Sequence, residues 1–419
     1  MSGTIEAEVC VMGAGPVGGT LACRLAAAGV ATVLVDRAAL PPTEHPAFDG
    51  RAYAVAAGSR DLLVAAGVWD RLPVPPNPIL DIRVSDGRLG RRPSRLHLHF
   101  DHHEAGADAG PFGWMVEARS LRMALNAFFP ELPALRVFAP AAAAVERQPD
   151  GAVVRIAANG ANPATELRCR LVVAAEGRDS PLREAAGIPV TRLPYHQTGI
   201  VCAISHDRPH DNLALEHFLP SGPFAVLPMG PSQDAELGGA PNVSAIVWTE
   251  RTPIARQVLR HDNARFGQEI ARRLGGHLGS HLGVIRMVGR RWSYPLSAML
   301  VHRYVDTRLA LAGDAAHGIH PIAGQGLNLG FRDAIALADL VIEAAGRGED
   351  PGRPALLARY QRQRRPDNLL MLGMTDGLER LFSNDNWLLR LARDVGIAAV
   401  DRTPPLKRLF MRRAMGLVG

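Results

Sequence analysis

Two glycine-rich segments, almost three hundred residues apart, carry the residue types and spacing of a nucleotide site. The first, Gly13–Gly18, reads G-A-G-P-V-G and matches G-x-G-x-x-G. In such a turn the first glycine permits a tight bend, the second lets the backbone approach a pyrophosphate, and the third lets a helix pack close to a strand. Asp36 lies 18 residues after Gly18, where a carboxylate can accept a hydrogen bond from a ribose hydroxyl. The alternative is an ordinary tight turn, but the flanking pattern favours dinucleotide binding.

The second segment begins at Gly313-Asp314, directly after the apolar run R-L-A-L-A. Asp314 at the end of a strand could bond a ribityl or ribose hydroxyl. Pro321 stiffens the loop that follows, and Gly324–Asn328 (G-Q-G-L-N) opens a helix whose exposed amides could stabilise negative charge on a reduced flavin ring. His317 and His320 are expected to be polar loop residues rather than metal ligands. The two segments together predict a flavin, with its adenosine end at the first and its reactive ring at the second.

The elements that must position these residues alternate between strands and helices. A βαβ unit is predicted from Glu8–Met12, Val17–Ala28 and Ala31–Val35. Further helices are expected at Ser59–Ala66, Ser120–Phe129, Thr252–Leu274 and 324–345, and further strands at Ile79–Arg83, Arg95–Phe100, Leu171–Ala175 and Arg308–Ala312. An antiparallel sheet is predicted from Thr198–Ser205, Ala214–Phe218, Phe224–Leu227 and Val243–Thr249.

This pattern predicts an α/β fold. A Rossmann-like cofactor-binding domain is split in sequence into residues 1–72, 113–183 and 289–345. The insertions 73–112 and 184–288 are expected to form a β-sheet substrate domain, and residues 346–419 a C-terminal helical region.

Composition excludes several classes of protein. Hydrophobic residues make up 47% and charged residues 21%, which is typical of a folded enzyme and excludes a disordered chain. The net charge of +6 comes from scattered arginines, with no basic run interleaved with aromatics, so nucleic acid is not expected as a partner. No apolar run reaches the ~18 residues that span a bilayer. With no secretory leader and no C-x-x-C spacing, we expect a cytoplasmic protein with reduced thiols.

The chain resembles the FAD-dependent aromatic hydroxylases, and more narrowly the UbiH/UbiF-type hydroxylases of ubiquinone biosynthesis. Gly13–Gly18 matches the first FAD fingerprint of that family and Gly313-Asp314 matches the third. The central fingerprint is similar to Ala174–Ser180, where Glu176 stands in place of the family aspartate. The longer side chain keeps the charge but moves it.

Other stretches strengthen the resemblance along nearly the whole chain. They include Asp49-Gly50-Arg51, Val116–Arg119, Ala214–Phe218, Gly222–Pro228 and the segment around Tyr360, Arg364 and Asn368. The motifs and the resemblance together imply an FAD site made of Gly13, Gly15, Pro16, Val17, Gly18, Asp36, Arg37, Arg51, Arg119, Glu176, Gly177, Gly313, Asp314, Pro321, Gly324, Gly326, Leu327 and Asn328.

The resemblance implies that FAD is reduced by NAD(P)H or a partner electron donor and then reacts with O2 to give a C4a-hydroperoxide, whose distal oxygen goes to a lipophilic phenol. No catalytic base is assigned. Candidates for an apolar substrate pocket are Phe224, Leu227, Pro228, Trp248 and Pro321. Alternatives are a hydroxylase of another aromatic substrate, an isoprenoid-type flavin reductase, and a scaffold that holds the flavin structurally.

Two surface features complete the expectations. The basic and apolar tail 406–413 suits either peripheral contact with the inner face of a membrane, as part of a multi-enzyme ubiquinone complex, or a helix docked on the core with solvated arginines. Histidines at positions 97, 99, 102 and 103 are expected to be a solvated strand edge, and no metal site is expected.

Overall fold

A computed structural model describes residues 4–40, 49–89, 97–105, 110–159, 163–231, 240–278, 281–383 and 403–416. The predicted βαβ unit is present as β1 (Thr4–Met12), α1 (Pro16–Ala27) and β2 (Thr32–Val35). Apolar residues fill this unit because both faces of its parallel sheet are covered. The helix ends where expected, since Gly29 follows with a φ of +81°.

The first sheet has the order β17-β18-β11-β1-β2-β8, and its strands from β18 to β8 are parallel. The strands not yet introduced are β8 (Leu135–Phe138), β11 (Thr165–Ala174), β17 (Val305–Asp306) and β18 (Leu309–Leu311), with β9 (Ala143–Gln148) and β10 (Gly151–Ile156) as an antiparallel extension of β11. Helices around this sheet are α2 (Ala57–Ala65), α3 (Ala118–Phe128), α4 (Pro181–Ala185) and α7 (Gln325–Gly346). A three-stranded sheet of β3 (Ala52–Ala56), β7 (Gly113–Glu117) and β4 (Asn77–Ile79) lies beside them.

The second large sheet has the order β19-β16-β12-β15-β14-β13-β5-β6. Its strands are β5 (Asp81–Asp86), β6 (His97–Asp101), β12 (Val190–His206), β13 (Leu213–Leu219), β14 (Gly222–Met229), β15 (Val243–Arg251), β16 (Ile285–Val301) and β19 (His317–Gly318). The four predicted antiparallel strands are confirmed as β12 to β15, although β12 is longer than expected. Arg95, at the start of the strand expected over 95–100, lies outside the described residues.

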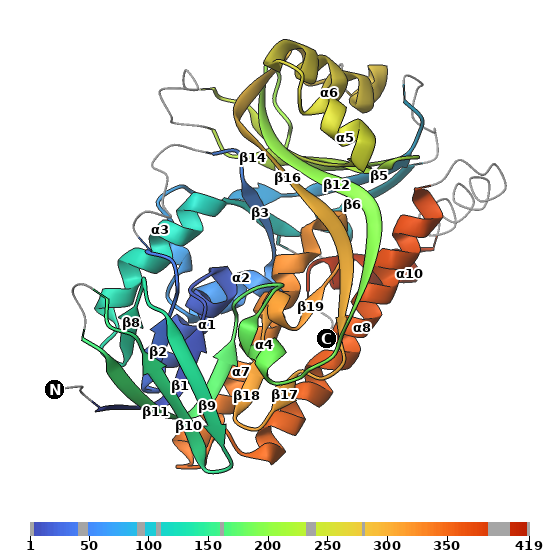
Figure 1. The fold of residues 1–419 in the computed structure, drawn as a ribbon. Coiled ribbons are helices and arrows are strands. Elements are labelled where there is room, and N and C mark those ends of the chain that lie inside the picture. Colours follow the sequence, from blue (N-terminus) through green and yellow to red (C-terminus); the bar gives the residue numbers. More distant parts are fainter. Residues whose placement is uncertain are drawn as a thin grey trace.

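The two faces of the second sheet have different neighbours. Its outer face is covered by α5 (Thr252–Val258) and α6 (Asn263–Leu278), and its inner face is turned toward the first domain (Figure 1). Side chains of a strand alternate between faces, so Phe224, Ile246 and Trp248 pack with α6 in one core cluster, whereas Ala203, Ala214 and Ala245 belong to another.

Strands β12 and β16 join the two domains. Each is 17 residues long, and they pair antiparallel from Val190↔Val301 to His206↔Ile285. Figure 1 shows this ribbon running from the second sheet down beside α4 and β17. The boundary expected between residues 288 and 289 therefore falls inside a continuous strand.

The C-terminal region is helical as expected. Helix α8 (Pro354–Phe382) crosses the molecule beside α7, and α10 (Pro404–Ala414) packs beside the second sheet (Figure 1). Among the described residues, no helix is both long and apolar enough to cross a membrane.

Candidate functional site

The predicted cofactor residues meet at one edge of the parallel sheet. Leu311, Ala174, Met12 and Val35 are register partners across β18, β11, β1 and β2. The chain leaves these four strands at one edge and there provides Gly313-Asp314, Glu176, Gly13 and Asp36. The carboxyl edge of a doubly wound sheet is where such folds bind nucleotides. Residues three hundred positions apart thus form a single site.

Two glycines of this edge are required by the protein's own packing. A Cβ on Gly13, whose φ is +106°, would lie 2.4 Å from the carbonyl oxygen of Ala175. A Cβ on Gly18 would lie 2.0 Å from the carbonyl oxygen of Gly13. These positions hold α1 close to β1, as the motif predicts.

Two other glycines face open space. Among the residues that the structure describes, no atom beyond the neighbouring backbone lies within 4 Å of a Cβ placed on Gly15 or on Gly326. Gly15 precedes α1 and Gly326 lies in the first turn of α7, and no side chain caps either helix. Because nothing in the described part of the chain requires glycine there, the free space and the exposed helix amides fit a group from outside the chain: a pyrophosphate at α1 and an electron-rich ring at α7. The residues present therefore fit FAD.

The acidic side chains of the site are partly engaged by the protein. Asp36 accepts hydrogen bonds from the amides of Ala14 (2.6 Å) and Ala38 (2.8 Å), so it braces the glycine turn and keeps lone pairs for a ribose hydroxyl. Glu176 accepts from Ser180 Oγ at 2.7 Å, and burial raises its pKa. The side chain of Asp314 is 53% exposed, with Arg178 Nε 3.8 Å away.

The predicted arginines and Asn328 are also held in place. Arg51 bonds Asp49 Oδ2 at 2.6 Å and covers the Trp292 ring at 4.2 Å, whereas Arg37 is exposed. Arg119 Nε bonds Glu117 Oε2 at 2.6 Å. Asn328 accepts from the Ala56 amide and donates to the Ala54 carbonyl, both at 2.9 Å, so its side chain ties the start of α7 to β3.

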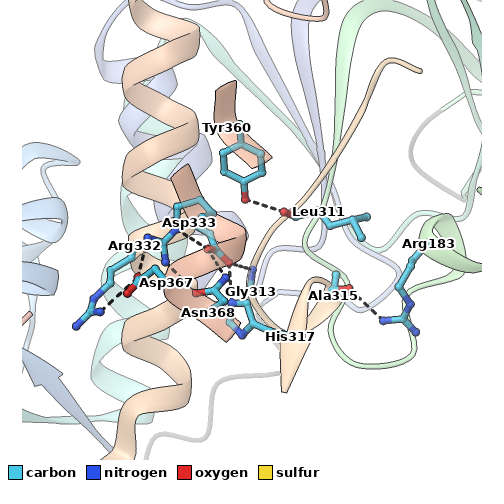
Figure 2. Close-up of polar contacts among 11 residues, drawn as sticks. Arg183, Leu311, Gly313, Ala315, His317, Arg332, Asp333, Tyr360, Asp367 and Asn368 are labelled. Atoms are coloured by element: carbon cyan, nitrogen blue, oxygen red, sulfur yellow. Dashed lines mark hydrogen bonds and ion pairs between the residues drawn. The ribbon is translucent and has the colours of Figure 1, made fainter. Parts of the chain in front are cut away.

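A buried ionic cluster supports the Gly313 turn from behind (Figure 2). Asp333 of α7 is fully buried and accepts bonds from the Gly313 amide (3.1 Å), His317 Nε2 (2.7 Å), Arg364 Nε (2.9 Å) and Asn368 Nδ2 (3.1 Å). Burial by itself would raise the pKa of Asp333, but His317 and Arg364 outweigh it and hold this pKa below its ordinary value.

A small cavity lies between the inner face of the second sheet and the loop that leads into α7. It is lined by Glu216, Pro223, Ala225, Leu227, Val247, Thr249, Pro321 and Gly324. Its volume is about 20 Å³, room for about one water molecule. Its lining is mostly apolar, with Glu216 and Thr249 as polar side chains, and Pro321 and Gly324 connect it to the start of α7.

Comparison with known proteins agrees with this geometry. The FAD binding domain family matches residues 6–371. Ubiquinone hydroxylase UbiL of Rhodospirillum rubrum is 48% identical over 98% of this chain and 90% of its own length. The 3-demethoxyubiquinol 3-hydroxylase of Escherichia coli is 32% identical over 98% of both chains. The chain belongs to this family of FAD-dependent hydroxylases.

The fold is shared more widely than the sequence. The crystal structure of p-nitrophenol 4-monooxygenase PnpA from Pseudomonas putida DLL-E4 superposes with a TM-score of 0.77 over 100% of this chain and 99% of that one, at 19% identity. The hydroxylase therefore has the Rossmann-like FAD domain, the inserted sheet and the C-terminal helices that its sequence predicts.

The substrate-pocket candidates of this hydroxylase fall on different faces of the sheet. Leu227 and Pro321 line the cavity. Phe224 and Trp248 lie on the outer face, where the Trp248 ring packs against Phe266 and under the Arg273 guanidinium at 3.8 Å. Pro228 does not line the cavity, and its carbonyl accepts a bond from Asn77. The physical reason is the two-residue alternation of β14 and β15.

Sequence reasoning missed the polar cavity residues Glu216 and Thr249. The alternation A-L-E-H-F over Ala214–Phe218 was the available signal, because it puts a glutamate on the same face as Ala214 and Phe218.

The histidines expected along a strand edge do lie on β6 and the turn after it. His99 pairs with Asp81 at 2.8 Å, and the ring of His102 stacks on His103. Asp101, His102 and His103 are close enough to share a metal ion by distance, but His102 Nδ1 already bonds the Leu80 carbonyl.

Proposed function

We propose that this enzyme adds a hydroxyl group to the aromatic ring of a polyprenylphenol precursor of ubiquinone. The observation that carries this proposal is the cavity in which an apolar sheet face closes over Pro321 and Gly324, beside the α7 terminus that fits a flavin ring. The similarity to proteins named ubiquinone hydroxylases supports the choice of substrate class. When bound, FAD supplies the activation of O2, with NAD(P)H or a partner protein as electron donor.

The chain's own part is to orient the ring and exclude water. Ala225, Leu227 and Val247 cover the cavity from the sheet side and Pro321 from the loop side. A dry site limits the reaction of activated oxygen with water and strengthens polar contacts to the substrate. The amides at the start of α7 favour negative charge on the cofactor ring.

Deletion of the gene in its host, followed by mass spectrometry of the quinone lipids, tests the proposal. We expect a prenylphenol one oxygen short to accumulate, to be cured by the wild-type gene and not by Asp314→Ala. Purified FAD-loaded enzyme supplied with a prenylphenol and ¹⁸O2 should place the heavy isotope on the ring. A product labelled from water, or a product with a reduced double bond and no new oxygen, would reject the hydroxylase in favour of another flavoenzyme.

We also propose that α10 contacts an anionic membrane surface, which would give the enzyme access to a lipid substrate. Met411 and Met415 are buried in the core cluster beneath the second sheet, while Leu409 is 46% exposed and Arg408 and Arg412 face solvent. Basic side chains flanking an exposed apolar one suit the surface of anionic lipids.

This surface is best tested by point substitution, because truncating the tail would also uncover the core around Met411. We expect Arg408→Gln/Leu409→Gln/Arg412→Gln to fold normally and to lose co-sedimentation with vesicles that contain phosphatidylglycerol. Arg155→Gln is the control, because the Arg155 side chain on β10 is 60% exposed. Equal sedimentation of the triple variant and the wild type would remove the membrane proposal.

A further inference from the structure

Glu216 is an acidic side chain on the inner face of the second sheet, where most of its neighbours are apolar. On β13 its neighbours Leu215 and His217 point to the outer face, where Leu215 joins the α6 core and His217 Nδ1 bonds Ser85 Oγ at 2.8 Å. Glu216 points to the inner face and lines the cavity with Pro321. In register, Glu216, Ala225 and Val247 form one row across β13, β14 and β15.

The carboxyl group of Glu216 has no partner among the residues that the structure describes. The residue is 9% exposed and makes no side-chain hydrogen bond or ion pair with them. Burial raises its pKa from 4.5 to about 8, and no charged neighbour contributes to the shift. The hydroxyl of Thr249, which lines the same cavity, is also buried without a hydrogen-bond partner. Buried polar groups are almost always bonded, so the unbonded hydroxyl of Thr249 beside the unbonded carboxyl group of Glu216, a residue that is 9% exposed, points to a ligand with a polar atom.

A second buried glutamate shows how this chain treats an acid that only supports the fold. Glu250 of β15 is 2% exposed on the outer face, and its Oε2 bonds Arg273 NH2 at 2.9 Å. On the outer face, Glu250 is therefore paired with an arginine. On the cavity side, Glu216 has no such partner among the described residues.

We propose that Glu216 is the residue that binds the substrate's phenolic hydroxyl and accepts its proton, an assignment that rests on the proposed function. The phenol O–H bond breaks, a new O–H bond forms on the Glu216 carboxylate, and the electron pair stays on the phenolate. That charge enriches the ortho and para ring carbons, one of which would form a bond to the electrophilic oxygen supplied through FAD and O2 while the bond from that oxygen to its leaving oxygen breaks. The ring carbon then loses its hydrogen as a proton, which the leaving oxygen takes up, and Glu216 returns the first proton to the phenolic oxygen. A base of this kind works best with a pKa near the working pH.

The test compares wild type, Glu216→Gln and Glu216→Asp, all loaded with FAD. The probe is 2-geranylphenol, and its affinity for the oxidised enzyme is measured without O2 or reductant from the flavin spectrum. We expect wild-type affinity to rise several-fold between about pH 6 and about pH 9 as the carboxylate becomes able to accept the hydrogen bond, and the affinity of Glu216→Gln to stay flat. Glu216→Asp should keep a pH-dependent affinity, and turnover of Glu216→Gln should fall roughly 100-fold. Glu146→Gln, on exposed β9, serves as the control for a removed acid.

The outcomes separate this assignment from the function it rests on. If Glu216→Gln keeps the wild-type pH dependence of both affinity and turnover, the role of Glu216 is overturned and the hydroxylase function stands. If FAD-loaded wild type neither binds nor hydroxylates any prenylphenol, the proposed function fails and the assignment fails with it.

Discussion

Asp333 and Arg364 are both buried and are joined at 2.9 Å, and the same aspartate receives the amide of Gly313. This pair links three parts of the chain: the turn that carries Asp314, helix α7 and the C-terminal helix α8. The position of the Gly313 turn therefore depends on a helix that follows the nucleotide-binding segments in sequence and packs into their core. Tyr360 adds a second link, because its hydroxyl donates to the carbonyl of Leu311 at 2.7 Å (Figure 2).

Replacing Asp333 by alanine should destabilise the protein and weaken FAD binding together. Removing one partner of a buried pair leaves the other charge uncompensated, at a cost of about 3–5 kcal/mol. Urea unfolding and fluorescence titration with FAD measure the two effects. Asp339→Ala, on the same helix with a side chain 63% exposed, should change neither. An Asp333→Ala protein with normal affinity for FAD would show that the cluster does not position the turn.

The glycines of the first motif should separate into two classes. Gly15→Ala should fold with normal stability and lose FAD affinity, because the added methyl meets no protein atom and occupies the open space beside α1. Gly18→Ala should destabilise the FAD-free protein, since its methyl would meet the Gly13 carbonyl at 2.0 Å. Thermal unfolding of the FAD-free proteins and calorimetric FAD binding distinguish them. Equal loss of stability in both variants would contradict this division.

Glu216→Gln should stabilise the folded protein at neutral and alkaline pH. Because burial raises the Glu216 pKa to about 8, folding favours the protonated form. The stability that protonated Glu216 contributes is fully present below the pKa of this group in the unfolded chain, 4.5. It is lost as pH rises through the pKa in the folded protein, about 8. We expect glutamine, which does not titrate, to raise the free energy of unfolding by on the order of 1–3 kcal/mol at high pH and by nothing near the unfolded pKa. Urea unfolding across pH measures the difference, and parallel curves for the two proteins would refute it.

Substitutions at Leu227 and at Trp248 should affect different quantities, KM at Leu227 and stability at Trp248. Leu227→Phe narrows the cavity and should raise KM for a prenylphenol roughly tenfold at unchanged stability. Trp248→Leu leaves a void under Arg273 and should cost about 2–4 kcal/mol of stability at unchanged KM. Steady-state kinetics beside thermal unfolding tests both. A raised KM in Trp248→Leu with an unchanged KM in Leu227→Phe would show that the outer face of the sheet forms the substrate site.

Some elements of the fold could be predicted from sequence because the pattern that indicates them lies within the element itself. The Gly13–Gly18 turn, α1 and the strand before Gly313 each combine a glycine with an apolar run of fixed length. Strand β16 was missed because it has no such signal: its residues include Pro295 and several arginines, and its strand form depends on pairing with β12 about a hundred residues earlier.

The candidate site divides in the same way. The sequence predicted which glycines and acids gather at the carboxyl edge of the parallel sheet, since such residues at strand ends are visible in one dimension. It could not assign Phe224 and Trp248 to a face, because alternation gives two faces and only α5 and α6 decide which one is covered. Glu216 was given no role for the same reason, because its place in the cavity depends on its side chain facing Pro321 rather than α6.

The cavity holds about one water molecule, so the β12–β16 ribbon between the two domains determines how a substrate's aromatic ring can enter it. Its lower end belongs to the first domain, where Met299 and Val301 join the nucleotide core and β19 pairs with it beside the Gly313 turn. Its register shifts between Pro194 and Thr198, where His196 has a φ of +56°, and again between Val201 and Ala203. Bulges of this kind bend and twist a strand. The two domains are thus joined by two hydrogen-bonded strands rather than by a single linker, and we expect this ribbon to bend at its two register shifts when a substrate ring enters.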